Sequence, residues 1–360
     1  MKFNNLSLLL VMFAMFFVGC SNDDNAPDID QTPVEEETTD PYEDGLLVVN
    51  EGPFQNGSGT VTFISEDLTE TQQAIFEEVN EEDLGNIVQS MTFKDTIAYI
   101  VVNNSHKIQV VNRYTFERVA VIDTDLLNPR YMAIANGKGY VTNWGYTVDE
   151  QDDFLAIVDL ETNSVIGTLP VELGPEAILA NDEYVYVAHQ GAWGQNNKVS
   201  VIDPTSDTVL KTIEVGDLPN TMQWDASGNL WVLCSGAPSY AAMETNGSLV
   251  QIDVTDNEVS QTLDFKTEQH PGGLNIDGDE LYFGLDGGVY EFNIDATELP
   301  SAPYLENASF YTMTVKDGKL YGTDAKDYAS QGDLLIYDLE TKELTNTLTV
   351  GVVPRGVYFN

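Results

Sequence analysis

The sequence is poor in cysteine, histidine and basic residues, and each shortage argues against a class of site. Its 360 residues include two cysteines, three histidines and 15 lysines and arginines, against 59 aspartates and glutamates. Nucleic-acid binding needs lysine and arginine clustered against phosphate, so a formal net charge of −44 argues against that function. A large negative net charge keeps the protein soluble and repels polyanions.

Motifs for catalysis and metal binding are also scarce. The histidines lie at positions 106, 189 and 270, and the chain has no HxxE, HExxH, CxxC or GxSxG motif. The acidic run Asn275–Asp279 occupies the place of an ordinary turn and lacks the distant glutamate of a calcium loop. The sequence therefore predicts no catalytic residue, no metal site and no cofactor. A metal or lactonase-like site around His189 and Glu176 stays open as an alternative.

The N-terminus has the pattern of an export signal. Lys2 is followed by an apolar run, Leu6–Val18, which is shorter than the roughly 20 residues of a membrane-spanning helix. Gly19-Cys20 resembles a bacterial lipoprotein box, although Phe17 replaces the usual leucine. The resemblance implies that residues 1–19 are a signal peptide and that Cys20 is lipidated. A lipid anchor is then the only membrane attachment, and Cys234 has no partner for a disulfide.

Residues 20–44 are predicted to be the lipidated cysteine and a disordered acidic tether. Segment 21–44 contains ten acidic residues, three prolines and no basic residue, so it cannot bury enough apolar surface to fold. Its start, Ser21-Asn22-Asp23-Asp24, resembles the signal that sends Bacteroidetes lipoproteins to the outer cell surface. We therefore expect an outer-membrane protein that faces the cell exterior, with an ordinary linker as the alternative interpretation of this segment.

Residues 45–360 repeat one strand-rich unit. One copy contains Tyr184–His189, Val199–Asp203 and Val209–Ile213, which are short, rich in β-branched and aromatic residues, and separated by turn residues. Aligned copies place seven apolar residues in one slot, at spacings of 39 to 52 residues: Met91, Met132, Ile178, Met222, Leu274, Met313 and Val357. Four strands in about 40–45 residues are typical of a propeller blade.

The two ends of this repeat complement each other. The repeat begins with a second strand, Leu46–Asn50, and ends on an innermost strand, Arg355–Phe359. We therefore predict an all-β fold, a seven-bladed β-propeller closed by pairing the C-terminal strand with the N-terminal blade. The polar stretch Asp67–Glu82 is predicted to be an inserted loop with one weak helical turn.

The predicted ligand-binding residues lie at one face of the ring. The long loops between second and third strands carry Phe54, Trp144, Tyr146, Trp193, Tyr240 and Tyr328. Aromatic side chains on loops of a rigid ring favour binding. The ends of second strands add a polar ring of Asn50, Asn103, Asn143, His189 and Asp286. Arg130 and Arg355, which each follow a proline, could pair with acidic neighbours or meet a carboxylate, amide or phosphate of a ligand.

Two segments, 184–219 and 331–356, resemble the YVTN-type repeats of surface-layer and YncE-like propellers. The opening residues 47–52, LVVNEG, followed by 57–61, GSGTV, are similar to the start of propeller lipoproteins in Bacteroidetes. Those include the BtuG group, which captures cobalamin above a TonB-dependent transporter.

This resemblance implies capture of a small ligand without catalysis. It makes cobalamin or another corrinoid the leading ligand, and a TonB-dependent outer-membrane receptor the partner. Two other functions stay open, because fold alone does not decide function. One is a structural or accessory subunit of an outer-membrane complex, and the other is a propeller hydrolase of the lactonase type.

Overall fold

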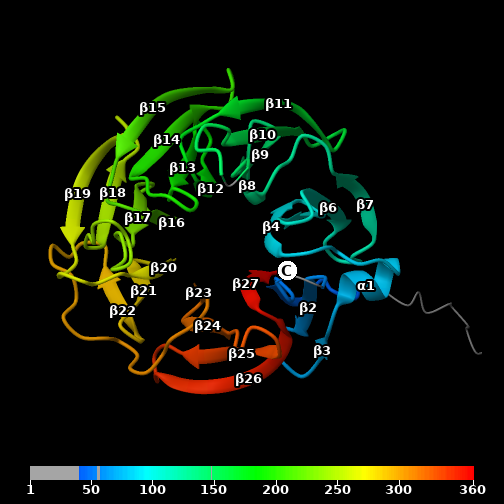
Figure 1. Ribbon diagram of the computed structural model, residues 1–360. Helices are drawn as coiled ribbons and strands as arrows, with labels where there is room; N and C mark the ends of the chain where they lie inside the picture. The colour runs from blue at the N-terminus through cyan, green and yellow to red at the C-terminus, as the bar shows by residue number, and fades with distance from the viewer. Residues whose placement is uncertain (1–39, 55–56, 147) are drawn as a thin grey trace, which may run out of the picture. The chain divides into compact units, whose positions relative to one another are not determined.

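A computed structural model of the protein describes residues 40–360, apart from 55–56 and 147. Cys20, the predicted signal peptide and most of the predicted tether lie outside the described residues. Within the described part, seven antiparallel sheets are arranged as the blades of a ring around a central channel (Figure 1). The predicted all-β, seven-bladed propeller is therefore confirmed.

The strands of each blade follow one another from the channel outward. Blade 1 consists of β27 (Pro354–Phe359), β1 (Gly45–Asn50), β2 (Thr60–Ser65) and β3 (Thr71–Gln72). Blade 2 consists of β4 (Val88–Lys94), β5 (Ile97–Val102), β6 (Lys107–Asn112) and β7 (Arg118–Ile122). Blade 3 consists of β8 (Pro129–Ala135), β9 (Lys138–Asn143), β10 (Phe154–Asp159) and β11 (Ser164–Pro170). Blade 4 consists of β12 (Pro175–Ala180), β13 (Val185–His189), β14 (Lys198–Asp203) and β15 (Thr208–Glu214).

The remaining blades complete the ring. Blade 5 consists of β16 (Pro219–Trp224), β17 (Leu230–Cys234), β18 (Ser248–Asp253) and β19 (Glu258–Asp264). Blade 6 consists of β20 (Gly272–Asp277), β21 (Glu280–Leu285) and β22 (Gly288–Asn293). Blade 7 consists of β23 (Met313–Lys316), β24 (Lys319–Asp324), β25 (Gln331–Asp338) and β26 (Glu343–Val352).

The seven apolar slot residues all lie on the innermost strands, as the repeat predicts. Closure of the ring is also confirmed, because β27 pairs antiparallel with β1 and Val357 lies opposite Val48. The last strand of the chain therefore shares a sheet with the first, and the two ends of the propeller are joined by backbone hydrogen bonds.

One local prediction needs correction, and a second gains detail. Blade 6 has three strands rather than four, because the chain after β22 makes only an isolated bridge, Val289 to Leu305, before it reaches blade 7. The Asp67–Glu82 stretch contains a short helix, α1 (Ile75–Asn80), where one helical turn was predicted, and also the two-residue strand β3. Ile75 and Phe76 of α1 are buried, so this helix covers part of the core of blade 1. No helix in the described part of the chain has the length and apolar character needed to cross a membrane.

The hydrophobic core is divided among the contacts between blades. The described residues form seven buried apolar clusters, and each joins neighbouring blades. Val101 of blade 2 packs with Val141 of blade 3 in one cluster, and Val357 of blade 1 packs with Leu334 of blade 7 in another. Burial of each such side chain stabilises the folded state by roughly 1.5–3 kcal/mol. Because a blade buries its faces only against its neighbours, stability depends on the closed ring.

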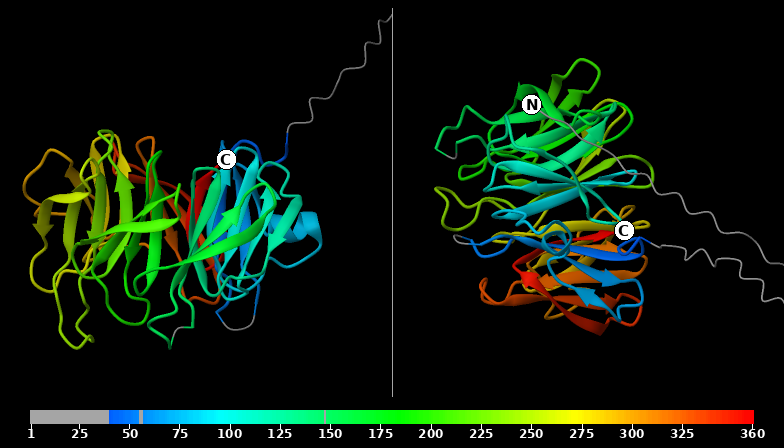
Figure 2. Two further views of the ribbon diagram at one scale, coloured as in Figure 1. Left: turned by 90° about the horizontal axis from the view of Figure 1, so that it is seen from above. Right: turned by 90° about the vertical axis from the view of Figure 1, so that its right-hand side faces the viewer.

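The ring has two different faces. At one face, which we call the loop face, inner strands begin, second strands end, and the long loops emerge. The opposite turn face carries short turns and the last residue, Asn360, whose side chain donates a hydrogen bond to the carbonyl of Tyr42. In Figure 2, left, the long loops lie on one side of the ring and the C-terminus lies on the other. Any ligand that contacts the loop aromatics therefore approaches from the side opposite to Tyr42.

Candidate functional site

One repeat position forms the mouth of the channel at the loop face. Each residue two places before an apolar slot residue lies within two residues of the start of an inner strand. Around the ring these mouth residues are Gln89, Arg130, Glu176, Asn220, Gly272, Tyr311 and Arg355. They surround the end of a central basin of about 650 Å³, which is lined by inner strands of all seven blades. A volume of this size lies within the usual range of small-molecule sites, about 300–1,000 Å³.

Four charged side chains form a neutral network at the mouth. Arg130 donates from Nε and Nη2 to the two carboxylate oxygens of Glu176, both at 2.8 Å. Arg355 donates from Nη1 to Glu51 Oε1 at 2.6 Å, and its Nη2 lies 3.9 Å from Glu176 Oε1. Glu51 directly follows β1, so it reaches Arg355 only because the ring closes.

This network is well shielded from water, and its charges cancel. The four side chains are between 6% and 19% exposed. Charges at such depth need partners, because removing them from water is costly. With two guanidinium groups and two carboxylates paired, the mouth presents hydrogen-bonding groups but no net charge. Such a surface suits uncharged polar groups, such as amides and hydroxyls, better than an isolated anion or cation.

Tyrosines extend the network across the mouth. The Tyr131 hydroxyl accepts a hydrogen bond from Arg355 Nη2 at 3.2 Å, and the Tyr311 hydroxyl donates to Glu51 Oε1 at 2.9 Å. Burial raises the pKa of Tyr311 to about 12, so this phenol keeps its proton at neutral pH. The ring of Tyr328 packs edge-on against Tyr311, with centroids 5.7 Å apart. Tyr328 therefore connects the exposed loops to the polar mouth.

Trp144 holds Arg130 in place. The guanidinium carbon of Arg130 lies 4.1 Å from the centroid of the Trp144 ring, a cation–π distance. The indole N–H of Trp144 donates to the carbonyl of Pro175 at 3.0 Å. Trp144 is thus placed beside the mouth, where it fixes the ion pair between Arg130 and Glu176.

The predicted strand-end polar residues are mostly buried beneath the site. Asn50, Asn103, Asn143 and His189 are each less than 9% exposed, and none lines the basin. The asparagine amides bond to backbone groups near strand ends; Asn143 Oδ1, for example, accepts from the backbone N–H of Leu127 at 2.9 Å. Direct ligand contact, predicted for these four residues, is not supported by this geometry, because these side chains are buried and bond to other groups of the protein.

His189 has no free nitrogen for a metal or for catalysis. Its Nδ1 lies 2.9 Å from the carbonyl oxygen of Glu172 and its Nε2 lies 2.8 Å from the hydroxyl of Ser200. Burial lowers the pKa of His189 to about 3, so the imidazole is neutral. Among residues 40–360, excluding the undescribed positions, no group of three or more His, Cys, Asp or Glu side chains is placed to hold a metal ion.

Of the six aromatics predicted on the long loops, all but Trp144 lie at exposed loop tips. Their exposed fractions are 70%, 66%, 79%, 90% and 59% for Phe54, Tyr146, Trp193, Tyr240 and Tyr328. They come from loops of five different blades on the loop face, yet none lines the central basin. The loop face therefore has an inner polar mouth and an outer set of apolar loop tips, and Tyr328 joins the two.

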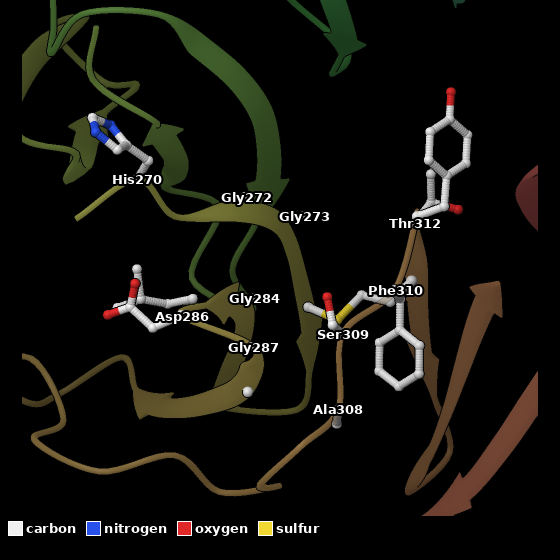
Figure 3. A pocket seen from close by; sticks show the side chains of 14 residues that line it. His270, Gly272, Gly273, Gly284, Asp286, Gly287, Ala308, Ser309, Phe310 and Thr312 are labelled. Atoms are coloured by element: carbon white, nitrogen blue, oxygen red, sulfur yellow. The ribbon is translucent and has the colours of Figure 1, made fainter. Parts of the chain in front are cut away.

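A second cavity of about 270 Å³ opens beside the mouth, between blades 6 and 7 (Figure 3). Asp286, another predicted site residue, lines it, and the Asp286 carboxylate accepts a hydrogen bond from Gln269 Nε2 at 2.9 Å. This cavity shares Gly273, Tyr311, Thr312 and Met313 with the central basin. We call it the glycine notch, because five glycines line it.

The structure brings Arg130, Trp144, Tyr328 and Arg355 together around the mouth. Sequence reasoning missed Glu51, Tyr131 and Tyr311 as site residues. The signal for Tyr311 was present, because it occupies the same repeat position as Arg130 and Arg355. It was hidden because the copy in blade 7 lacks the proline that marks this position in five other blades.

Comparisons with known proteins agree with this fold. A family model described as "Domain of unknown function (DUF5074)" matches residues 44–350. The seven-bladed beta-propeller protein Rv1057 of Mycobacterium tuberculosis (strain ATCC 25618 / H37Rv) is 30% identical over 134 residues. Those residues are 36% of this chain and 32% of Rv1057, so the match spans about a third of that relative.

The solved structures that are similar over most of the chain include two from bacteria. A quinoprotein alcohol dehydrogenase-like protein from Bacteroides thetaiotaomicron has a TM-score of 0.66 at 14% identity, covering 88% of this chain and 78% of that one. A periplasmic gluconolactonase from Pseudomonas aeruginosa has a TM-score of 0.62 at 14% identity, covering 87% of this chain and 99% of that one. At such identities the likeness shows the fold alone.

Proposed function

This chain belongs to the DUF5074 family, and we propose that it captures an uncharged, polar small molecule at the channel mouth on the loop face. The observation that carries the proposal is the basin of about 650 Å³, rimmed by a charge-neutral network of Arg130, Glu176, Arg355 and Glu51. Paired charges present directed hydrogen bonds without attracting ions, which suits a ligand rich in amides or hydroxyls.

The resemblance of the predicted anchor and of the opening residues 47–52 and 57–61 to Bacteroidetes propeller lipoproteins supports a finer proposal. The ligand is a corrinoid such as cobalamin, which is a large ring that carries many amide groups. The protein is anchored in the outer membrane by a lipid on Cys20, faces the exterior, and passes its ligand to a TonB-dependent receptor. The exposed loop tips, such as Trp193 and Tyr240, give such a receptor or a large ligand an apolar surface to contact.

Isothermal titration of the purified protein with cyanocobalamin tests the proposal. Asn220 lines the basin but is outside the ion network, so Asn220→Ala removes one amide without disturbing paired charges. Loss of one neutral hydrogen bond corresponds to about 0.5–1.5 kcal/mol, or roughly two- to twelvefold weaker binding. A matched control is Asn346→Ala on the outer strand β26, which should bind as the unaltered protein does. Equal affinity of all three proteins would refute the mouth as the site, and no binding at all would refute the corrinoid.

A further inference from the structure

One of the seven mouth positions has no side chain. Gly272 stands where Arg130, Glu176, Asn220, Tyr311 and Arg355 stand in other blades. The polar rim of the basin is therefore interrupted at blade 6, and the glycine notch lies at this interruption. We propose that the glycine notch is a second ligand subsite, which receives an uncharged arm of the ligand whose body occupies the central basin. This inference rests on the proposed function.

The notch is an extension of the basin rather than a separate cavity. The two cavities share Gly273, Tyr311, Thr312 and Met313, so a ligand in one can continue into the other. The notch holds about 270 Å³, which is just below the usual range of about 300–1,000 Å³ for a whole small-molecule site. It therefore has room for a substituent of a ligand rather than for a second independent ligand.

The fold keeps this space open in two ways. A β-carbon on Gly272 would meet no atom within 4 Å, so no neighbouring side chain fills the gap. Blade 6 also lacks a fourth strand, and the linker to blade 7 returns to the loop face instead. In Figure 3, Gly272 and Gly273 form one side of the notch and the Ala308–Thr312 part of this linker forms the other.

The lining indicates what kind of arm would fit. Glycine backbone, the hydroxyl of Ser309 and apolar groups such as Met313 form the walls, whereas the Thr312 hydroxyl is bonded to the carbonyl of Arg355, and no lysine or arginine lines the notch. His270 and Asp286, the titratable groups among its lining other than Tyr311, are bonded to neighbours: His270 to Ser235 and Glu244, and Asp286 to Gln269. An uncharged arm with an amide or hydroxyl group matches this mixture of hydrogen-bonding and apolar surface.

Two independent fillings of the notch test the inference by titration with cyanocobalamin. Gly272→Gln restores the missing side chain at the mouth. Ser309→Phe fills the notch from the opposite wall, at a residue that does not line the basin. We expect each variant to bind about tenfold more weakly or worse, because the arm loses its place. Gly167→Gln on the outer strand β11 is the matched control, since a β-carbon there also meets no atom within 4 Å. It should bind as the unaltered protein does.

Thermal unfolding of each variant must remain near that of the unaltered protein, which separates loss of the subsite from loss of the fold. Unchanged affinity of Ser309→Phe would overturn the inference, even if Gly272→Gln binds weakly, because that pattern means that only the basin is used. If the unaltered protein binds cyanocobalamin and neither Gly272→Gln nor Ser309→Phe weakens that binding, the subsite proposal is refuted and the proposed function stands. If the unaltered protein binds no cyanocobalamin, the proposed ligand fails and the notch proposal fails with it.

Discussion

Replacement of Arg355 by methionine removes the cation that joins both glutamates at the mouth. Glu51 then loses the guanidinium nitrogen that lies 2.6 Å from its carboxylate. Glu176 loses a positive charge 3.9 Å away but keeps its ion pair with Arg130. Removing one partner of a buried ion pair costs about 3–5 kcal/mol, because the other charge stays uncompensated. Here the carboxylate of Glu51 is 15% exposed, so water screens it in part. We therefore expect Arg355→Met to lower the free energy of unfolding by about 2–4 kcal/mol.

Chemical denaturation of four proteins measures this effect: the unaltered protein, Arg355→Met, Glu51→Gln and the double variant. Because Glu51→Gln removes the stranded charge, the double variant should be more stable than the sum of the two single losses predicts. A coupling energy of about 1 kcal/mol or more is expected for groups in direct contact. Additive losses, or an Arg355→Met variant within about 0.5 kcal/mol of the unaltered protein, would refute the account of a buried, charge-balanced mouth.

Two further predictions concern other parts of the chain. Burial lowers the pKa of His189 to about 3, against 6.5 when unfolded, so unfolding takes up a proton between these pH values. The stability that depends on the neutral imidazole is therefore fully present above pH 6.5 and is lost as the pH falls toward 3. Asparagine stands at this position at the ends of β1 and β9. The variant His189→Asn should therefore remove up to about 1.4 kcal/mol per pH unit from the pH dependence of the free energy of unfolding. An unchanged pH profile of unfolding would contradict the buried neutral imidazole. If Cys20 is lipidated, Cys20→Ala should be released in soluble form or retained unprocessed, and unchanged membrane association on cell fractionation would remove the lipoprotein proposal.

The ring could be predicted from the sequence because its signal is repeated. Each strand is a short apolar run, and seven copies of the slot from Met91 to Val357 define seven inner strands. The missing fourth strand of blade 6 was not predicted, although the linker carries Pro300 and Pro303. Proline has no N–H to donate to a ladder, which disfavours a strand there. An average taken over the repeats conceals such a local exception.

The candidate site was only partly predictable, because its key contacts join distant residues. The sequence left open whether Arg130 and Arg355 pair with acidic neighbours or bind a ligand. Pairing with Glu176 and Glu51 follows from the neighbouring positions of blades in the closed ring, and Glu51 is 304 residues from Arg355. Asn at a strand end has a turn-forming role as well as a binding role, and burial of Asn50 and Asn143 was not visible in the sequence.

A crystal structure of the protein grown with cyanocobalamin tests the central claim most directly. The account predicts ligand density over the channel mouth on the loop face, with amide groups within hydrogen-bond distance of Asn220 and of the network around Arg355. Density confined to the turn face, or to loop tips such as Tyr240 with the basin left to water, would contradict capture at the mouth.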